Sequence, residues 1–206
     1  MVTLYGDMIS GNCYKVAWLL TALDQPFQFE YVNILEGKAR TPDFLAMNPN
    51  GKIPLVSTDE GYLSESNAII HYFAERANRY LPQDSFTKAK VLQWQFFEQY
   101  SHEPVIAVAR FIQKFQGAPE HRLAELEGLQ KQAGRVLAVM EHQLQSQAYF
   151  AGAEFSLADM SLFAYTHVAD EGGISVADYP AIQGWLQRIQ QRPDYVPMAD
   201  LAAKYQ

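Results

Sequence analysis

Hydrophobic and polar positions follow different periods in the two parts of the chain. In the first eighty residues, short strand-like runs alternate with helical ones. Residues 2–5 form a brief apolar run, and Phe27, Phe29 and Tyr31 alternate with polar residues as in a half-buried strand. Residues 14–23, between these runs, carry apolar side chains at helical spacing. The pattern therefore begins strand, helix, strand.

The remainder of this part predicts a short helix, a hairpin and a closing helix. Thr41 followed by Pro42 is typical of a helix start. The runs 53–57 and 62–64 flank a tight-turn sequence, and a helical period extends from about residue 65 to residue 79. An order of βαβ followed by ββα is that of a thioredoxin-like domain, which we assign to residues 1–79.

Residues 80–87 break the pattern and are predicted to be a linker. Beyond it, residues 88–206 have a helical period almost throughout and predict an all-helical domain. Within that domain, Ser156 and Asp159 have the spacing of a capping box, with Phe155 placed as a hydrophobic staple. The predicted fold class is thus α/β plus all-α.

Charge and composition narrow the range of partners. The chain of 206 residues has a net charge of −7, which argues against a nucleic-acid backbone or an acidic membrane as a partner. No apolar run approaches the roughly 20 residues needed to span a bilayer, and the N-terminus lacks the features of a signal peptide. These two features predict a cytoplasmic location. One cysteine and unpatterned histidines give no zinc site or redox pair, so we expect no metal.

Two segments predict a site for a small peptide-like ligand. Pro54 in a β-branched run implies an edge, a bulge or a cis bond that exposes the backbone of Ile53 for pairing. Lys52 adds a cation, and Glu65 with Ser66 stands at a helix start, which favours an anion such as a carboxylate. Together they suit an extended ligand with a carboxylate at each end.

The loop after the first strand carries the candidate chemistry. Ser10 and Cys13 have the spacing of a CxxC motif whose first cysteine is a serine, at the expected start of a helix. The ligand would then supply the thiolate, and Ser10 would donate a hydrogen bond to it. No histidine lies nearby in sequence to act as a base, which argues against a serine hydrolase.

Four segments in this order resemble the cytosolic glutathione transferases: Ser10-Gly11-Asn12-Cys13, Asn50-Gly51-Lys52-Ile53-Pro54, Glu65-Ser66-Asn67-Ala68-Ile69 and Phe155-Ser156-Leu157-Ala158-Asp159. The resemblance covers almost the whole chain. It implies that glutathione is a co-substrate and that no other cofactor is required. Ser10 matches the catalytic serine of the theta-, zeta- and delta-like groups, whereas Asn12 matches an asparagine of the nu-like group, and either could be the main thiolate donor.

The same resemblance implies the remaining ligand contacts. The backbone of Ile53 would pair with the cysteinyl part of glutathione, Lys52 would approach the glycyl carboxylate, and Glu65 with Ser66 would hold the γ-glutamyl end. Cys13 matches no reactive cysteine of the family, although a mixed disulfide with glutathione is its alternative role. The expected pocket for a second, hydrophobic or disulfide substrate involves Ile9, Tyr100, His102 and Arg110.

The sequence thus predicts a glutathione transferase, which the resemblance implies is a homodimer, that directs glutathione thiolate at an electrophilic small molecule. A glutathione-dependent disulfide or peroxide reductase of the nu-like kind is one alternative. The other is a non-catalytic relative that serves as a stress-response or assembly module, although the presence of Lys52, Glu65 and Ser66 favours an active site.

Overall fold

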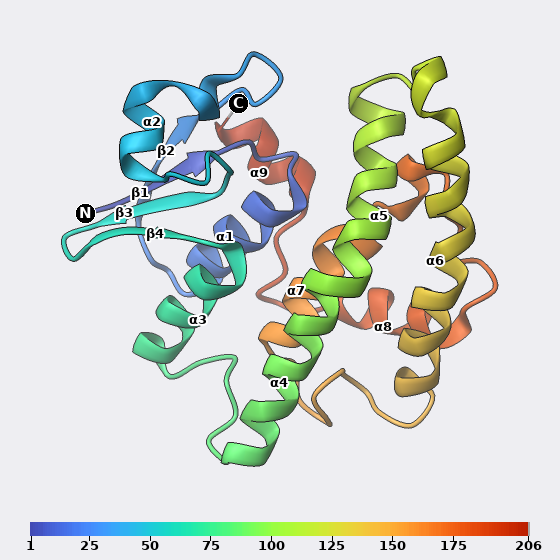
Figure 1. Ribbon diagram of the computed structural model, residues 1–206. Coiled ribbons are helices and arrows are strands. Elements are labelled where there is room, and N and C mark those ends of the chain that lie inside the picture. The colour runs from blue at the N-terminus through green and yellow to red at the C-terminus, as the bar shows by residue number, and fades with distance from the viewer. Residues whose placement is uncertain (206) are drawn as a thin grey trace. The chain divides into compact units, whose positions relative to one another are not determined.

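The computed structural model of the chain describes residues 1–205 and divides them into two compact units (Figure 1). Unit 1 comprises residues 1–79 together with 193–205, and unit 2 comprises residues 80–192. Each unit has its own set of elements. Those of unit 1 are β1 (Val2–Gly6), α1 (Gly11–Ala22), β2 (Phe27–Tyr31), α2 (Pro42–Met47), β3 (Leu55–Thr58), β4 (Gly61–Ser64), α3 (Ser66–Ala77) and α9 (Met198–Tyr205).

The sheet of unit 1 has four strands in the order β2-β1-β3-β4. β1 pairs parallel with β2 and antiparallel with β3, and β3 and β4 form an antiparallel hairpin. Leu55 packs into a cluster with Phe44 of α2, while its buried neighbour Val56 points to the opposite face of the sheet by strand alternation. The helical and strand order expected for a thioredoxin-like domain is therefore confirmed.

Helix α1 is more deeply buried than its sequence period indicated. Residues 13–20 are all fully buried, including Trp18 and the charged residue Lys15. Burial on every side explains why α1 lacks a distinct polar face. α1 packs against α3 and α9.

The C-terminal segment belongs to unit 1, whereas the sequence placed it in the helical domain. The hydroxyl of Tyr14 donates to the carbonyl oxygen of Val196, and the indole of Trp18 donates to that of Asp194. Tyr205 of α9 packs on the rings of Phe27 and Phe29 in β2. These contacts fix residues 193–205 on the α/β unit. The expected bounds of the helical domain, residues 88–206, are therefore wrong at the C-terminal end: the helical unit comprises residues 80–192.

Unit 2 is helical, as expected, and begins earlier than predicted. Asp84 caps α4, accepting a hydrogen bond from Thr87 N at 2.8 Å, so residues 85–87 of the expected linker 80–87 are helical. π-helical turns at Glu98–His102 and Phe111–Phe115 border α5 on either side. The helices of unit 2 are α4 (Ser85–Phe97), α5 (Glu103–Arg110), α6 (Leu123–Leu144), α7 (Leu157–Thr166) and α8 (Pro180–Gln190).

The predicted capping box of α7 is present and extends into the core of unit 2. Ser156 caps the helix, and the fully buried Asp159 accepts hydrogen bonds from the backbone N–H groups of Ser156 and Phe150. The indole of Trp185 in α8 donates to the same carboxylate at 3.0 Å. Asp159 therefore joins α7, α8 and the loop before α7. None of the helices described in residues 1–205 has the length and apolar character that crossing a bilayer requires.

Candidate functional site

Three loops of unit 1 meet at one end of the sheet. In the strand register, Tyr5 pairs with Leu55 and Leu55 pairs with Ser64. Because β3 is antiparallel to both neighbours, the chain leaves β1, enters β3 and leaves β4 at the same end. Residues 7–10, residues 52–54 and residues 65–66 are therefore neighbouring segments, and they contain most of the residues that the sequence singled out.

The first of these loops leads into the N-terminus of α1. Ser10 is the N-cap residue, with φ −76° and ψ 126°, and its carbonyl oxygen accepts the Tyr14 N–H at 2.8 Å. The side chain of Ser10 makes no hydrogen bond to the helix backbone. Its hydroxyl is thus not used as a helix cap and instead interacts with the Cys13 thiol, at a helix start where an anion is favoured. Ile9 precedes it, with its N–H bonded to the Asp7 carboxylate at 3.1 Å.

The start of α3 is joined directly to the start of α1. Ser66 is the first residue of α3 and is buried, and its hydroxyl donates to Oδ1 of Asn12 at 3.0 Å. Glu65 is the N-cap residue and has φ 68°, a left-handed conformation that few residues with a side chain adopt. The two helix starts, whose first backbone N–H groups have no acceptor within the helix itself, therefore face one site.

The loop before β3 is braced from inside. Nδ2 of the buried Asn48 donates to the carbonyl oxygen of Lys52 at 2.8 Å. The Ile53–Pro54 peptide bond is cis, which was one of the three geometries expected from the sequence. Ile53 lies outside β3, which begins at Leu55, and the side chain of Lys52 is exposed.

Arg40 is a second cation at this loop that the sequence reasoning missed. Gly51 has φ 59°, and a Cβ atom placed there would lie 2.8 Å from Nη1 of Arg40. The guanidinium therefore packs over the residue that precedes Lys52. The short basic stretch containing Lys38 and Arg40 was the only indication in the sequence, and it looks like an ordinary solvated loop.

Cys13 is a structural residue of the first turn of α1. Its side chain is fully buried and its Sγ accepts the Asp7 N–H at 3.5 Å. Burial raises the pKa of the Cys13 thiol to about 12, although hydrogen bonds from Asp7 and Ser10 act in the lowering direction. A thiol with this pKa is a poor nucleophile at neutral pH, which supports the interpretation of Cys13 as a buried, unreactive group.

In unit 2, the three residues expected to line a second-substrate pocket lie in different environments. Tyr100 is 87% exposed. His102 is fully buried, and its Nε2 bonds Oγ1 of Thr166 at 2.9 Å; because that hydroxyl donates to Leu162 O, the histidine is the donor. Arg110 is also buried and forms a salt bridge with Glu171. The structure does not bring these three side chains together.

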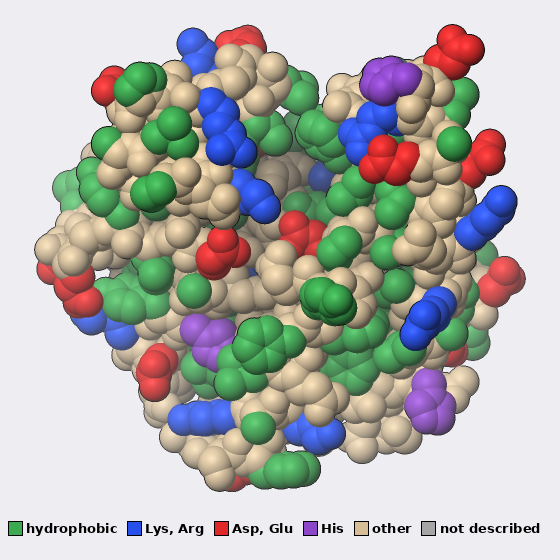
Figure 2. Space-filling view, in the orientation of Figure 1, with side chains coloured by type: hydrophobic (Ala, Val, Ile, Leu, Met, Phe, Trp, Pro, Cys, Tyr) green, Lys and Arg blue, Asp and Glu red, His purple; other side chains and the backbone are tan. Residues whose placement is uncertain are grey.

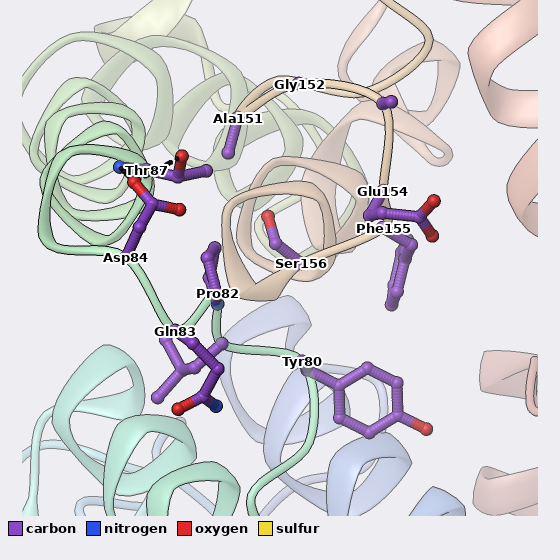
Figure 3. Close-up of a pocket in the computed structure, with 12 residues that line it drawn as sticks. Tyr80, Pro82, Gln83, Asp84, Thr87, Ala151, Gly152, Glu154, Phe155 and Ser156 are labelled. Atoms are coloured by element: carbon purple, nitrogen blue, oxygen red, sulfur yellow. Dashed lines mark hydrogen bonds between the residues drawn. The ribbon is translucent and has the colours of Figure 1, made fainter.

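A cavity of about 490 Å³ in unit 2 contains none of these candidates (Figure 3). Its walls come from the segment before α4 and the loop before α7, and the side chains of Asp84 and Ser156 face it. Both side chains act as helix caps. The chemistry of the candidate site therefore rests on unit 1.

A thioredoxin-like unit with a serine at the start of α1, a cis-proline loop before β3 and a Glu-Ser pair at the start of α3 defines a class of glutathione-binding proteins. Comparison with known families agrees. Residues 4–82 match the glutathione S-transferase N-terminal domain, and residues 94–193 match the glutathione S-transferase C-terminal domain. The chain belongs to the glutathione S-transferase family, and the fold expected from the sequence is confirmed.

Relatives of several kinds are similar to the chain over most of its length. Glutathione S-transferase 3 of Zea mays is 32% identical over 93% of this chain and 90% of its own. The disulfide-bond oxidoreductase YfcG of Escherichia coli is 27% identical over 88% of this chain and 87% of its own. Among solved structures, a glutathione S-transferase from Pseudomonas fluorescens has a TM-score of 0.93 and 50% identity, covering 97% of this chain and 99% of that one.

Proposed function

We propose that the protein is a glutathione transferase that binds glutathione at the end of the unit 1 sheet and directs its thiolate at an electrophilic small molecule. The observation that carries this proposal is the Asn12–Ser66 hydrogen bond of 3.0 Å, which holds the N-termini of α1 and α3 at one site. Glutathione has an anionic group for each helix start, namely its thiolate for α1 and its γ-glutamyl carboxylate for α3.

Ser10 and Asn12 have different roles in this mechanism. Ser10, whose hydroxyl is not used as a cap, donates a hydrogen bond to the thiolate. Asn12 accepts the hydroxyl of Ser66 and so holds the γ-glutamyl subsite in place. The thiolate sulfur then forms a bond to the electrophilic carbon, and the leaving group departs with the electron pair of its bond. No cofactor other than glutathione takes part.

The other contacts with glutathione come from the loops before α3 and before β3. Ser66 and the α3 N-terminus bind the γ-glutamyl carboxylate, and Glu65 binds the α-ammonium group beside it. The backbone of Ile53 pairs with the cysteinyl residue. Lys52 binds the glycyl carboxylate, and the position of Arg40 over Gly51 supports a second cation there.

A calorimetric titration with glutathione, together with thiolate absorbance measured across pH, tests this mechanism. We expect binding with a thiol pKa below that of free glutathione. Ser10→Ala should raise the thiol pKa and lower kcat/KM by about 10²- to 10³-fold, as loss of one positioned donor does elsewhere. Asn12→Ala should instead weaken binding of S-methylglutathione, which has no ionisable thiol. A wild type that binds no glutathione would overturn the proposal in favour of a non-catalytic module.

Reduction of a disulfide is a second candidate function, favoured by the similarity to the Escherichia coli oxidoreductase and by the presence of Asn12. In that reaction, glutathione thiolate attacks a disulfide sulfur, releases one thiolate and forms a mixed disulfide. A second glutathione then reduces this mixed disulfide, and oxidised glutathione leaves. Parallel assays with chlorodinitrobenzene and with hydroxyethyl disulfide distinguish the two activities, because only the second yields oxidised glutathione.

Members of this family commonly dimerise, and we propose that this chain forms a homodimer through the apolar face of α4 and the turn after it. Phe86, Phe96 and Tyr100 are each at least 70% exposed, and hydrophobic side chains gather over this region in Figure 2. Tyr100 also lines a groove of about 480 Å³ with Val139 of α6. Large exposed aromatic side chains on one face are typical of an interface between subunits.

A cytoplasmic location remains a prediction from the sequence.

A further inference from the structure

A second hydrogen bond joins α1 to α3 immediately behind the Asn12–Ser66 pair. Nζ of Lys15 donates to Oδ1 of Asn67 at 3.0 Å. Lys15 is fully buried, which is rare for a lysine and costly unless the charge has a purpose or partners. Nothing in the mechanism above uses this side chain.

The position of Lys15 relates it to the candidate site. Asn12 and Lys15 are three residues apart on α1 and therefore share a face, with about 5–6 Å between their Cβ atoms. Their partners, Ser66 and Asn67, are consecutive in the first turn of α3. The ammonium thus lies about one helical turn behind the thiolate subsite, on the side of α1 that faces α3.

The charge of Lys15 acts on the thiol of Cys13, two residues away. Burial dominates and raises the pKa of that thiol, while the Lys15 charge is the smallest contribution and acts in the lowering direction. A positive charge in a fully buried position is screened less by solvent than an exposed one. It adds to the positive end of the α1 dipole.

We propose that Lys15 is a positioning residue of the glutathione site that also lowers the thiol pKa of bound glutathione. Its bond to Asn67 holds the first turn of α3 in register with α1, and its buried charge stabilises the thiolate. This inference rests on the proposed function, since it concerns the same ligand.

Other titratable groups lie around α1, and they are common to all the variants compared below. Asp7, in the loop before the helix, raises the pKa of Cys13 by its charge. His71 is on α3, four residues after Asn67 and so on the same face. Asp194 and Tyr195 belong to the segment that packs on Trp18.

The test uses two substitutions that separate charge from geometry. Lys15→Met removes both the charge and the hydrogen bond. Asn67→Asp keeps an acceptor oxygen for Lys15 at a helix start that tolerates an acid, but it adds a negative charge that offsets the ammonium. Lys131→Met, at an exposed position on α6 of unit 2, is the control for loss of one positive charge.

Two quantities are measured for each protein: the thiol pKa of bound glutathione from thiolate absorbance, and the affinity for S-methylglutathione from calorimetry. Lys15→Met should raise the thiol pKa by about one unit, which is a tenfold loss of thiolate relative to thiol. It should also lower the affinity for S-methylglutathione several-fold. Asn67→Asp should raise the thiol pKa, and Lys131→Met should change neither quantity.

An unchanged thiol pKa in Asn67→Asp would overturn the inference, because that variant alters the local charge while retaining the bond. This holds even if Lys15→Met does not fold. If both variants match the wild type, the role proposed for Lys15 is overturned, but the proposed transferase function stands. A wild type without glutathione binding would instead remove the proposed function itself.

Discussion

At the scale of single residues, the neighbouring polar residues at the start of α1 have different structural roles. Ser10, Asn12 and Cys13 occupy one short motif, yet Ser10 is a cap residue whose hydroxyl does not bond the helix backbone, Asn12 braces Ser66 and Cys13 is buried. The sequence favoured Ser10 as the principal thiolate donor and left Asn12 as a residue that assists or replaces it. The hydrogen bond to Ser66 supports the distinction between them.

The burial of Cys13 makes a prediction about its reactivity. Because burial raises the pKa of this thiol to about 12, almost none is thiolate at pH 8. Iodoacetamide should therefore label the native protein at least about a hundredfold more slowly than the urea-unfolded chain, as followed by mass spectrometry. Cys13→Ala should keep its kcat/KM for glutathione conjugation. Rapid labelling of the native protein would point instead to a reactive cysteine.

At the scale of elements, helix ends in unit 2 are stabilised by side chains that are distant in sequence. The buried Glu141 of α6 accepts hydrogen bonds from the N–H groups of Ala181 and Ile182, each at 3.0 Å. A carboxylate at the start of α8 also interacts favourably with the helix dipole. This long-range cap has no sequence signature, unlike the local Ser156–Asp159 box of α7.

Removing the Glu141 carboxylate should destabilise the protein. Glu141→Ala leaves one buried and one partly buried N–H group of α8 without their acceptor, so we expect a loss of about 1–3 kcal/mol in the free energy of unfolding, measured with urea. Glu127→Ala, at an exposed position on the same helix, is the control and should change stability by less than about 0.5 kcal/mol. Equal losses in the two variants would rule out a capping role.

Two buried groups at the ends of α7 give the stability opposite dependences on pH. Burial raises the pKa of the Asp159 carboxyl to about 6, so its contribution is present at low pH and is lost as pH rises toward 6. Burial lowers the pKa of His167 to about 4, so its contribution is present above its unfolded pKa of 6.5 and is lost as pH falls toward 4. Each amounts to about 3 kcal/mol, and the two nearly cancel between pH 4 and 6.

Substituting either residue should expose the pH dependence that the other residue gives to the free energy of unfolding. His167→Phe keeps an aromatic ring stacked on Phe163, and its free energy of unfolding should fall as pH rises from 4 to 6. Asp159→Asn should show the reverse slope. Urea unfolding at several pH values measures both, and variants with the same slope as the wild type would contradict this account.

At the scale of the whole molecule, the sequence predicted unit 1 well because its determinants are local. Strand alternation in β2, the Thr41 cap of α2 and the Glu-Ser start of α3 each lie within a few residues. The cap and the helix start are present, and the alternation holds at Phe27 and Phe29 but not at the exposed Tyr31. The burial of Lys15 and the placement of α9 depend on contacts far apart in the chain. The apolar residues Met198 and Leu201 suit packing on any helix, so no pattern could assign them to unit 1.

The proposed homodimer is also tested at this scale. Phe96→Glu places a charge on the apolar face of α4 and Tyr100→Glu places one on the turn after it, where each native side chain is at least 70% exposed. If this face joins two copies, each variant should sediment as a monomer at concentrations where the wild type is a dimer, since burying an unpaired charge is costly. Tyr62→Glu, on the edge strand β4, is a comparison at another exposed tyrosine. A wild-type monomer would overturn the proposed dimer.

The return of residues 193–205 to unit 1 has a consequence for how the protein is made. On the ribosome, the strands and helices of the α/β unit emerge first, but the partners of Tyr14 and Trp18 emerge only after all of unit 2 has been synthesised. Until then, the aromatic side chains of Tyr14 and Trp18 in the nascent unit 1 lack these partners. The helical unit is continuous in sequence and can fold before them. The order of folding is expected to be the reverse of the order of synthesis.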